Sequence, residues 1–104
     1  MKTIARLTIA TLLGMALITT YSSADTIKGK KIYIKQLKVK CAMSGGKFTA
    51  KHTQKEWEDI YDAGLLNGEI KKICGGHTVG EKLLPHIYDF AYEYASDSGN
   101  VPNC

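Results

Sequence analysis

The segment TQKEWEDIY, residues 53–61, contains the clearest start of a helix in the sequence. Thr53 followed three residues later by Glu56 is the pattern of a capping box, in which the two side chains satisfy free backbone N–H groups at a helix start. The residues behind it that fall on one helical face are Trp57, Ile60, Tyr61 and Gly64. This segment therefore predicts an amphipathic helix with the chain's single tryptophan on its inner face.

Apolar residues at helical spacing also occur before this segment. From Thr26 to about Lys40 the apolar residues at helical spacing are Ile27, Ile34, Leu37 and Cys41, with Tyr33 beside them. The alternation of Leu37, Val39 and Cys41 would also suit a strand, and we predict a helix because the longer pattern has the helical period. We expect the Ser-Gly-Gly stretch at 44–46 to break the chain after it.

Two more helices are predicted behind the capped one. An apolar stripe runs from Leu66 until Cys74-Gly75-Gly76 ends it, as glycine does at helix C-termini. Pro85 suits the first turn of a last helix, with Gly99 as its stop. The inner face of that helix is predicted to contain Leu84, Ile87, Tyr88, Ala91, Tyr94 and Ala95. The sequence predicts an all-α protein with long helices at both chain ends and shorter ones between them.

The first 24 residues have the pattern of a cleaved signal peptide. Lys2 and Arg6 precede an uncharged apolar run from Leu7 to Thr20, and small residues at 22–24 suit cleavage after Ala24. The run is about 14 residues, short of the roughly 20 that span a bilayer. We therefore predict that residues 25–104 form one domain, exported to the periplasm and without a stable membrane anchor after cleavage.

Charge is unevenly distributed along the chain. Residues 28–55 contain nine lysines and no acidic residue, whereas residues 56–104 contain three lysines and nine acidic residues. Such a lopsided charge is typical of a surface that attracts an oppositely charged partner. The proposed docking lysines are Lys28, Lys30, Lys31, Lys35, Lys38 and Lys40. An acidic periplasmic protein, an anionic membrane surface and a merely solvated lysine face are the three alternatives. Residues 25–104 contain no arginine, which argues against a nucleic-acid partner.

Three cysteines in an exported chain predict one disulfide and one unpaired thiol. The candidates are Cys41, Cys74 and Cys104. Since a chain terminus holds a fixed position only when something ties it down, we expect the bridge to involve Cys104, paired with Cys41 or Cys74.

Several segments resemble a known family. Gly29-Lys30-Lys31-Ile32-Tyr33, followed by CAMSGG at 41–46, is similar to the opening of a small class I c-type cytochrome, where a helix with an aromatic residue leads into the haem-attachment segment. Residues 56–60 and the LPHIYDF segment at 84–90 resemble the second half of such domains. The resemblance implies a cytochrome c-like helical domain associated with periplasmic electron transfer, with Cys41 at the position of the first attachment cysteine.

The chain departs from that family at the attachment motif. Covalent haem requires C-x-x-C-H, and here Ser44 and Gly45 replace the second cysteine and the histidine. We therefore predict no covalent haem. Cys41 and Met43 are the candidate cofactor-binding residues, of types that accept non-covalent haem or copper. The candidate metal ligands are Cys74, His77 and His86.

The remaining histidine and the enzyme motifs add no site. His52, just before the capping Thr53, is predicted to be an exposed loop residue. G-x-S-x-G, C-x-x-C and P-loop motifs are all absent, so we predict no enzyme activity. The favoured function is a haem-less accessory or docking module in periplasmic electron transfer. The alternative is a disulfide-stabilised periplasmic binding or structural protein with no redox role.

Overall fold

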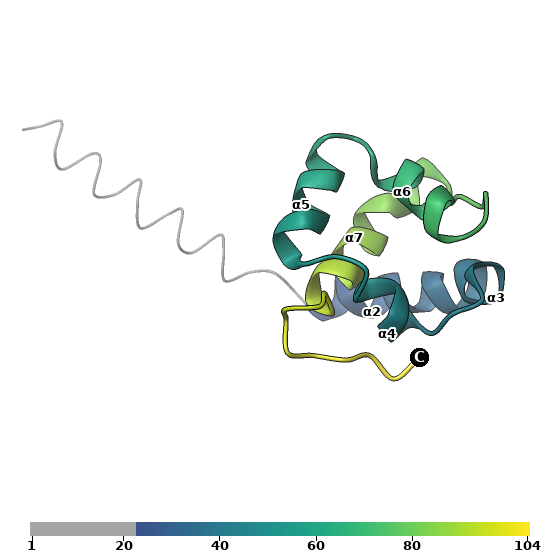
Figure 1. The fold of residues 1–104 in the computed structure, drawn as a ribbon. Helices are drawn as coiled ribbons and strands as arrows, with labels where there is room; N and C mark the ends of the chain where they lie inside the picture. Colours follow the sequence, from purple (N-terminus) through teal and green to yellow (C-terminus); the bar gives the residue numbers. More distant parts are fainter. Residues whose placement is uncertain (1–22) are drawn as a thin grey trace, which may run out of the picture.

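The computed structural model describes residues 23–104, and the predicted signal segment up to residue 22 lies outside them. Helices are the only regular secondary structure in residues 23–104, as the sequence predicts. They are α2 (Ser23–Ile32), the π-helix η1 (Tyr33–Leu37), α3 (Lys38–Cys41), α4 (Gly45–Thr49), α5 (Gln54–Asp62), α6 (Leu66–Ile73), the 3₁₀-helix η2 (Glu81–Leu83) and α7 (Leu84–Glu93). Figure 1 shows α2 and α3 along one edge of the molecule, with α5 and α6 at the opposite edge.

The elements α2, η1 and α3 follow one another without a break, which confirms the first predicted helix. Four of its buried residues recur every four positions, at Gly29, Tyr33, Leu37 and Cys41, and Ile32 is buried beside them. Four residues of an α-helix turn by about 400°, so this stripe would drift by about 40° at each step. The wider turn of the π-helix between Tyr33 and Leu37 counteracts the drift and keeps the stripe on the core.

The predicted inner face of this helix was partly wrong. Ile27 and Ile34 are exposed, although their helical spacing suggested burial. They lie seven residues apart and so occupy one face, but α7 packs against the opposite one, at Gly29.

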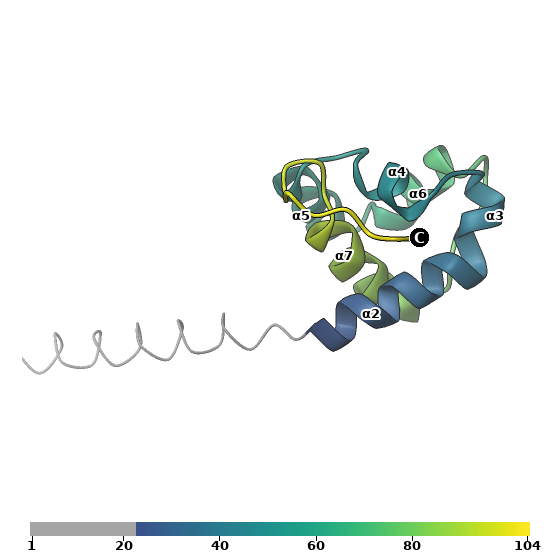
Figure 2. The same cartoon turned by 90° about the horizontal axis from the view of Figure 1, so that it is seen from below.

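Helix α7 crosses α2 at Gly29 (Figure 2). A Cβ atom at Gly29 would lie 2.8 Å from both the carbonyl carbon of His86 and Cβ of Phe90, and closer still to the carbonyl oxygen of His86. Only glycine therefore allows the two backbones to approach this closely.

The chain turns between α3 and α4 at residues 42–44. Ala42 has a φ of 55°, in the left-handed region, and ends α3. The side chain of Ser44 then accepts a hydrogen bond from the N–H of Lys47, which makes Ser44 the N-cap of α4. The break is thus slightly earlier than predicted, because Gly45 and Gly46 already belong to the next helix.

The capping box that opens α5 is confirmed, with Thr53 and Glu56 bonded in both directions. Trp57 is fully buried, and its indole N–H donates to the carbonyl oxygen of Thr49 at 2.9 Å. Rings from four elements meet around it, with centroid distances of 5.6 Å for Phe48–Trp57, 4.9 Å for Tyr33–Phe48 and 5.7 Å for Tyr33–Phe90. This aromatic cluster is the centre of the core.

Helix α6 ends as predicted, with Cys74 at its C-cap and positive φ angles at Gly75 and Gly76. The loop behind it is held by Asn67 of α6, whose amide donates to the carbonyl of Val79 at 2.7 Å and accepts from its N–H at 3.1 Å.

Pro85 lies in the first turn of α7, as predicted, but α7 has only ten residues. It ends at Glu93, so Gly99 is not its stop; Gly99 makes a turn in the tail that follows. The tail is attached to α5, since the side chain of Asp97 accepts from the N–H of Gln54 and the N–H of Ser96 donates to the carbonyl of His52. It then returns toward α4, where the chain ends (Figure 1).

Candidate functional site

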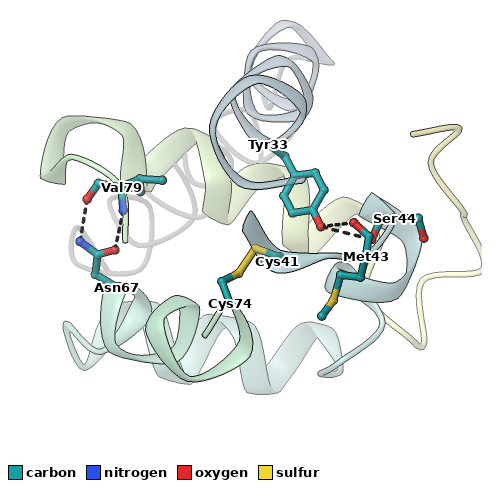
Figure 3. Close-up of a disulfide and its surroundings, with 7 residues drawn as sticks. All are labelled: Tyr33, Cys41, Met43, Ser44, Asn67, Cys74 and Val79. Atoms are coloured by element: carbon teal, nitrogen blue, oxygen red, sulfur yellow. Dashed lines mark hydrogen bonds between the residues drawn. A yellow bond between two sulfur atoms is a disulfide. The ribbon is translucent and has the colours of Figure 1, made fainter. Parts of the chain in front are cut away.

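A disulfide joins Cys41, at the end of α3, to Cys74, at the end of α6 (Figure 3). Both cysteines are buried in the core. The predicted bridge to Cys104 was therefore wrong, and Cys104 is the unpaired thiol. Cys41 and Cys74 are also lost as candidate cofactor and metal ligands, because a disulfide sulfur has no thiolate to offer.

The terminus is tied down by other contacts. The N–H of Gly45 donates to the main-chain oxygen of Cys104 at 3.1 Å, and Pro102 is buried. The ammonium of Lys30 donates to the side-chain oxygen of Asn103. Together these contacts hold the chain end over α4 and α2 without a covalent link.

Cys104 fills the space beside Gly45. A Cβ atom at Gly45 would lie 3.0 Å from Cζ of Phe90 and would overlap the sulfur of Cys104. Any side chain at position 45 would therefore have to displace the terminal cysteine.

Tyr33 fixes the turn at residues 42–44 from within the core (Figure 3). Its phenol donates to the carbonyl oxygens of Met43 at 2.7 Å and Ser44 at 3.3 Å. Burial, and to a smaller extent the charge of the nearby Cys104, raise the pKa of Tyr33 to about 12. The phenol therefore stays protonated and remains a hydrogen-bond donor at physiological pH.

Residues 41–45 thus do not suit a covalently held haem. Cys41 is bonded to Cys74, Ser44 caps α4, and the space at Gly45 is taken by Cys104. Met43 is half-buried and packs against the core. The segment has neither a free thiol nor an imidazole where the family's motif requires them.

The structure does not bring the predicted metal ligands together. Cys74 is in the disulfide, His77 is exposed in the turn after α6, and His86 is half-buried in the first turn of α7, with Nδ1 buried and unpaired. Within residues 23–104 no group of three histidine, cysteine or acidic side chains is placed to hold a metal ion.

His52 is not the exposed loop residue that was predicted. Its Nε2 lies 2.7 Å from Oε2 of Glu69, and its Nδ1 lies 3.6 Å from Oε1 of Glu56. Its ring packs edge-on against Trp57, with ring centroids 4.7 Å apart. The pKa of Glu56 is lowered, chiefly because the N–H of Thr53 donates to it and in part because of the charge of His52. The sequence contains no signal for this contact, since Glu69 is 17 residues away.

An open cleft of about 430 Å³ was also missed. Its lining comes from the end of α5, the turn into α6, the start of α6, η2 and the start of α7: Tyr61, Asp62, Gly64, Leu66, Glu81, Leu84 and Pro85. The ring of Tyr61 is held by stacking on Tyr88, with ring centroids 4.4 Å apart. Because two separate stretches of the chain, residues 61–66 and 81–85, line the cleft, no local sequence pattern marks it.

The lysines of the predicted docking surface are exposed along α2, η1 and α3, except Lys30, which is half-buried and turned to Asn103. We use "lysine face" for the exposed charged and aliphatic residues of these elements: Ile27, Lys28, Lys31, Ile34, Lys35, Lys38, Val39 and Lys40. Farther along the chain, Lys55 is neutralised by Asp59 at 2.8 Å, and this hydrogen bond raises the pKa of Lys55.

No family model, curated protein or solved structure matches the chain.

Proposed function

We propose that this protein is an exported accessory module of periplasmic electron transfer. It is similar in arrangement to small class I c-type cytochromes, lacks covalent haem, and docks through the lysine face on an anionic partner. An acidic periplasmic protein is one of the partners that the sequence allows for this face. The observation that carries the proposal is the crossing of α2 and α7 at Gly29.

That crossing joins two of the segments that resemble the family. Gly29 to Tyr33 belongs to the opening segment, and Phe90 belongs to the closing segment LPHIYDF. In the fold, Gly29 lies against Phe90, and the rings of Tyr33 and Phe90 are 5.7 Å apart. Two segments about 60 residues apart in sequence thus form one helix–helix contact, and this contact is the support for a cytochrome c-like arrangement.

The proposed absence of covalent haem is supported by the contacts that these residues make instead. The disulfide links the end of α3 to α6, and the terminal Cys104 fills the space beside Gly45. The aromatic cluster of Tyr33, Phe48, Trp57 and Phe90 packs the centre of the core. These contacts give the domain a core made from its own side chains.

The alternative is a disulfide-stabilised periplasmic binding or structural protein with no redox role. The Cys41–Cys74 disulfide fits this alternative equally well, because a covalent link between α3 and α6 stabilises a domain of this size whatever its function.

A haem-restoration experiment separates the two. The full chain is expressed together with a cytochrome c maturation system, and the purified protein is tested by haem stain on a denaturing gel and by absorption spectroscopy. We expect no stain and no Soret band for the native chain. A stained native band would contradict the proposal that the module lacks covalent haem.

The matched variant rebuilds the attachment motif. Cys74→Ala frees Cys41, Ser44→Cys and Gly45→His restore C-x-x-C-H, and Cys104→Ala vacates the space beside residue 45. If the architecture is cytochrome c-like, this variant stains for haem once circular dichroism shows that it is folded. A folded variant without haem favours the alternative.

A further inference from the structure

The lysine face combines positive charge with exposed aliphatic side chains. Ile27 is 52% exposed, Ile34 41% and Val39 88%. Lys28, Lys31, Lys35, Lys38 and Lys40 are exposed among them. No acidic residue occurs from Thr26 to Lys55, and Asp25 at the start of α2 is the one acidic residue close to these lysines in the sequence.

Helix geometry places the central residues of this surface in one row. Ile27, Lys31, Ile34 and Lys38 are spaced by four, three and four residues, which is the spacing of a single helical face. The opposite face carries Gly29, Tyr33 and Leu37 and is buried against the core. The row is therefore the outward side of the helix, with isoleucine and lysine alternating along it.

The composition of the face suits lipid better than protein. Protein interfaces are enriched in arginine, aromatic residues and methionine and depleted in lysine. The lysine face has no arginine and no aromatic side chain, since Tyr33 on the same helix points into the core. Lysines around protruding aliphatic groups match an anionic bilayer, where ammonium groups meet lipid phosphates and the aliphatic groups enter the headgroup boundary.

We propose that the lysine face binds the surface of an anionic phospholipid bilayer. The five exposed lysines lie at the headgroups, and Ile27, Ile34 and Val39 insert below them, with α2, η1 and α3 parallel to the membrane plane. No helix within residues 23–104 is long and apolar enough to cross a membrane, and the proposed contact is peripheral. The inference rests on the lysine face alone and names an anionic partner for it, whether or not the module is related to cytochromes.

The test uses vesicles of defined composition. The protein is mixed with vesicles of phosphatidylcholine containing 30 mol% phosphatidylglycerol, or of phosphatidylcholine alone, and the bound fraction is measured by flotation. We expect binding to the anionic vesicles only, with a loss of binding as salt rises because the Debye length shortens.

Paired variants locate the contact. Neutralising Lys31 and Lys35 with Lys31→Gln and Lys35→Gln should weaken binding about fivefold per lysine, hence about 25-fold together. The control is Lys71→Gln with Lys82→Gln, which has the same net charge but changes exposed lysines outside the lysine face and should bind like the native protein. Equal weakening in the two variants would overturn the proposal, because binding would then follow net charge alone.

Aliphatic insertion is tested separately. Ile27→Ser with Ile34→Ser keeps every charge and should reduce binding about tenfold, while the melting temperature stays near the native value because both side chains are exposed. Unchanged binding in this variant would show that the isoleucines do not insert.

Two further outcomes would overturn the inference. One is equal binding to vesicles with and without phosphatidylglycerol. The other is no vesicle binding by a protein that associates with an acidic periplasmic protein through Lys31 and Lys35. The second outcome would leave the proposed docking function standing, and a negative haem-restoration experiment would leave the lipid contact standing.

Discussion

Replacing Gly29 by alanine tests the α2–α7 crossing on which the proposed function depends. A Cβ atom there would lie 2.8 Å from the carbonyl carbon of His86 and 2.8 Å from Cβ of Phe90, and would overlap the His86 carbonyl oxygen. Two of these atoms are backbone, so no rotation of a side chain relieves the overlap. Accommodating the methyl group requires α2 and α7 to move apart.

The expected loss combines two opposing effects. Overpacking a core contact costs typically 1–3 kcal/mol and occasionally more, and a backbone contact belongs at the upper end of that range. Alanine in place of glycine within a helix raises the free energy of unfolding by up to about 1 kcal/mol through its higher helix propensity. We expect a net loss of about 2 kcal/mol in the free energy of unfolding, which lowers the melting temperature by roughly 10 °C in a domain of this size.

The matched control is Gly68→Ala in α6. Gly68 is also helical, but a Cβ atom there would have no neighbour within 4 Å. We expect it to raise the free energy of unfolding by about 0.5–1 kcal/mol through helix propensity alone. Both variants are measured by urea and thermal unfolding followed by circular dichroism. If Gly29→Ala is as stable as Gly68→Ala, the close crossing does not exist and the argument from it fails.

Three further predictions concern the core and the disulfide. Trp57→Ala should reduce the free energy of unfolding by about 3–5 kcal/mol, since Trp57 is fully buried and its N–H bonds Thr49; an unchanged urea midpoint would contradict its place in the core. Loss of the disulfide in Cys41→Ala with Cys74→Ala should lower the free energy of unfolding by about 4 kcal/mol, for a separation of 33 residues. Cys104→Ala should leave the disulfide intact, which mass spectrometry without reductant can check. The Tyr33 phenol should titrate near pH 12 in an absorbance titration. Because its pKa is raised on folding, the free energy of unfolding should fall as pH rises from about 10 toward 12. Titration of every tyrosine near pH 10 in the folded protein would refute this.

Much of the secondary structure could be predicted because its signals are local. The bonds between Thr53 and Glu56 join residues three apart, and Gly75 and Gly76 end α6 through their own φ angles. Pro85 starts a helix because its ring sets its own φ. Each of these depends on residues within one turn of the chain, so the amino-acid order suffices to predict it.

The candidate site could be predicted only in part. The absence of C-x-x-C-H and the run of lysines from Lys28 to Lys40 are visible in the sequence. Which cysteines pair is not, because pairing requires two sulfur atoms to meet in space, and residues 41 and 74 meet only after α3 and α6 have packed. The contact of His52 with Glu69 was missed for the same reason.

The sequence by itself determined that the protein is helical, that one helix starts behind the Thr53 cap and another ends at Cys74, and that its positive charge is concentrated before residue 56. Tertiary structure alone decided which side of the first helix is buried. Ile27 and Ile34 have the helical spacing of a buried face, yet they face outward because Gly29 is the position where a second backbone can approach. A helix has one buried face only when a partner covers it, and the choice of face therefore belongs to the packing of α7 on α2 and not to the helix itself.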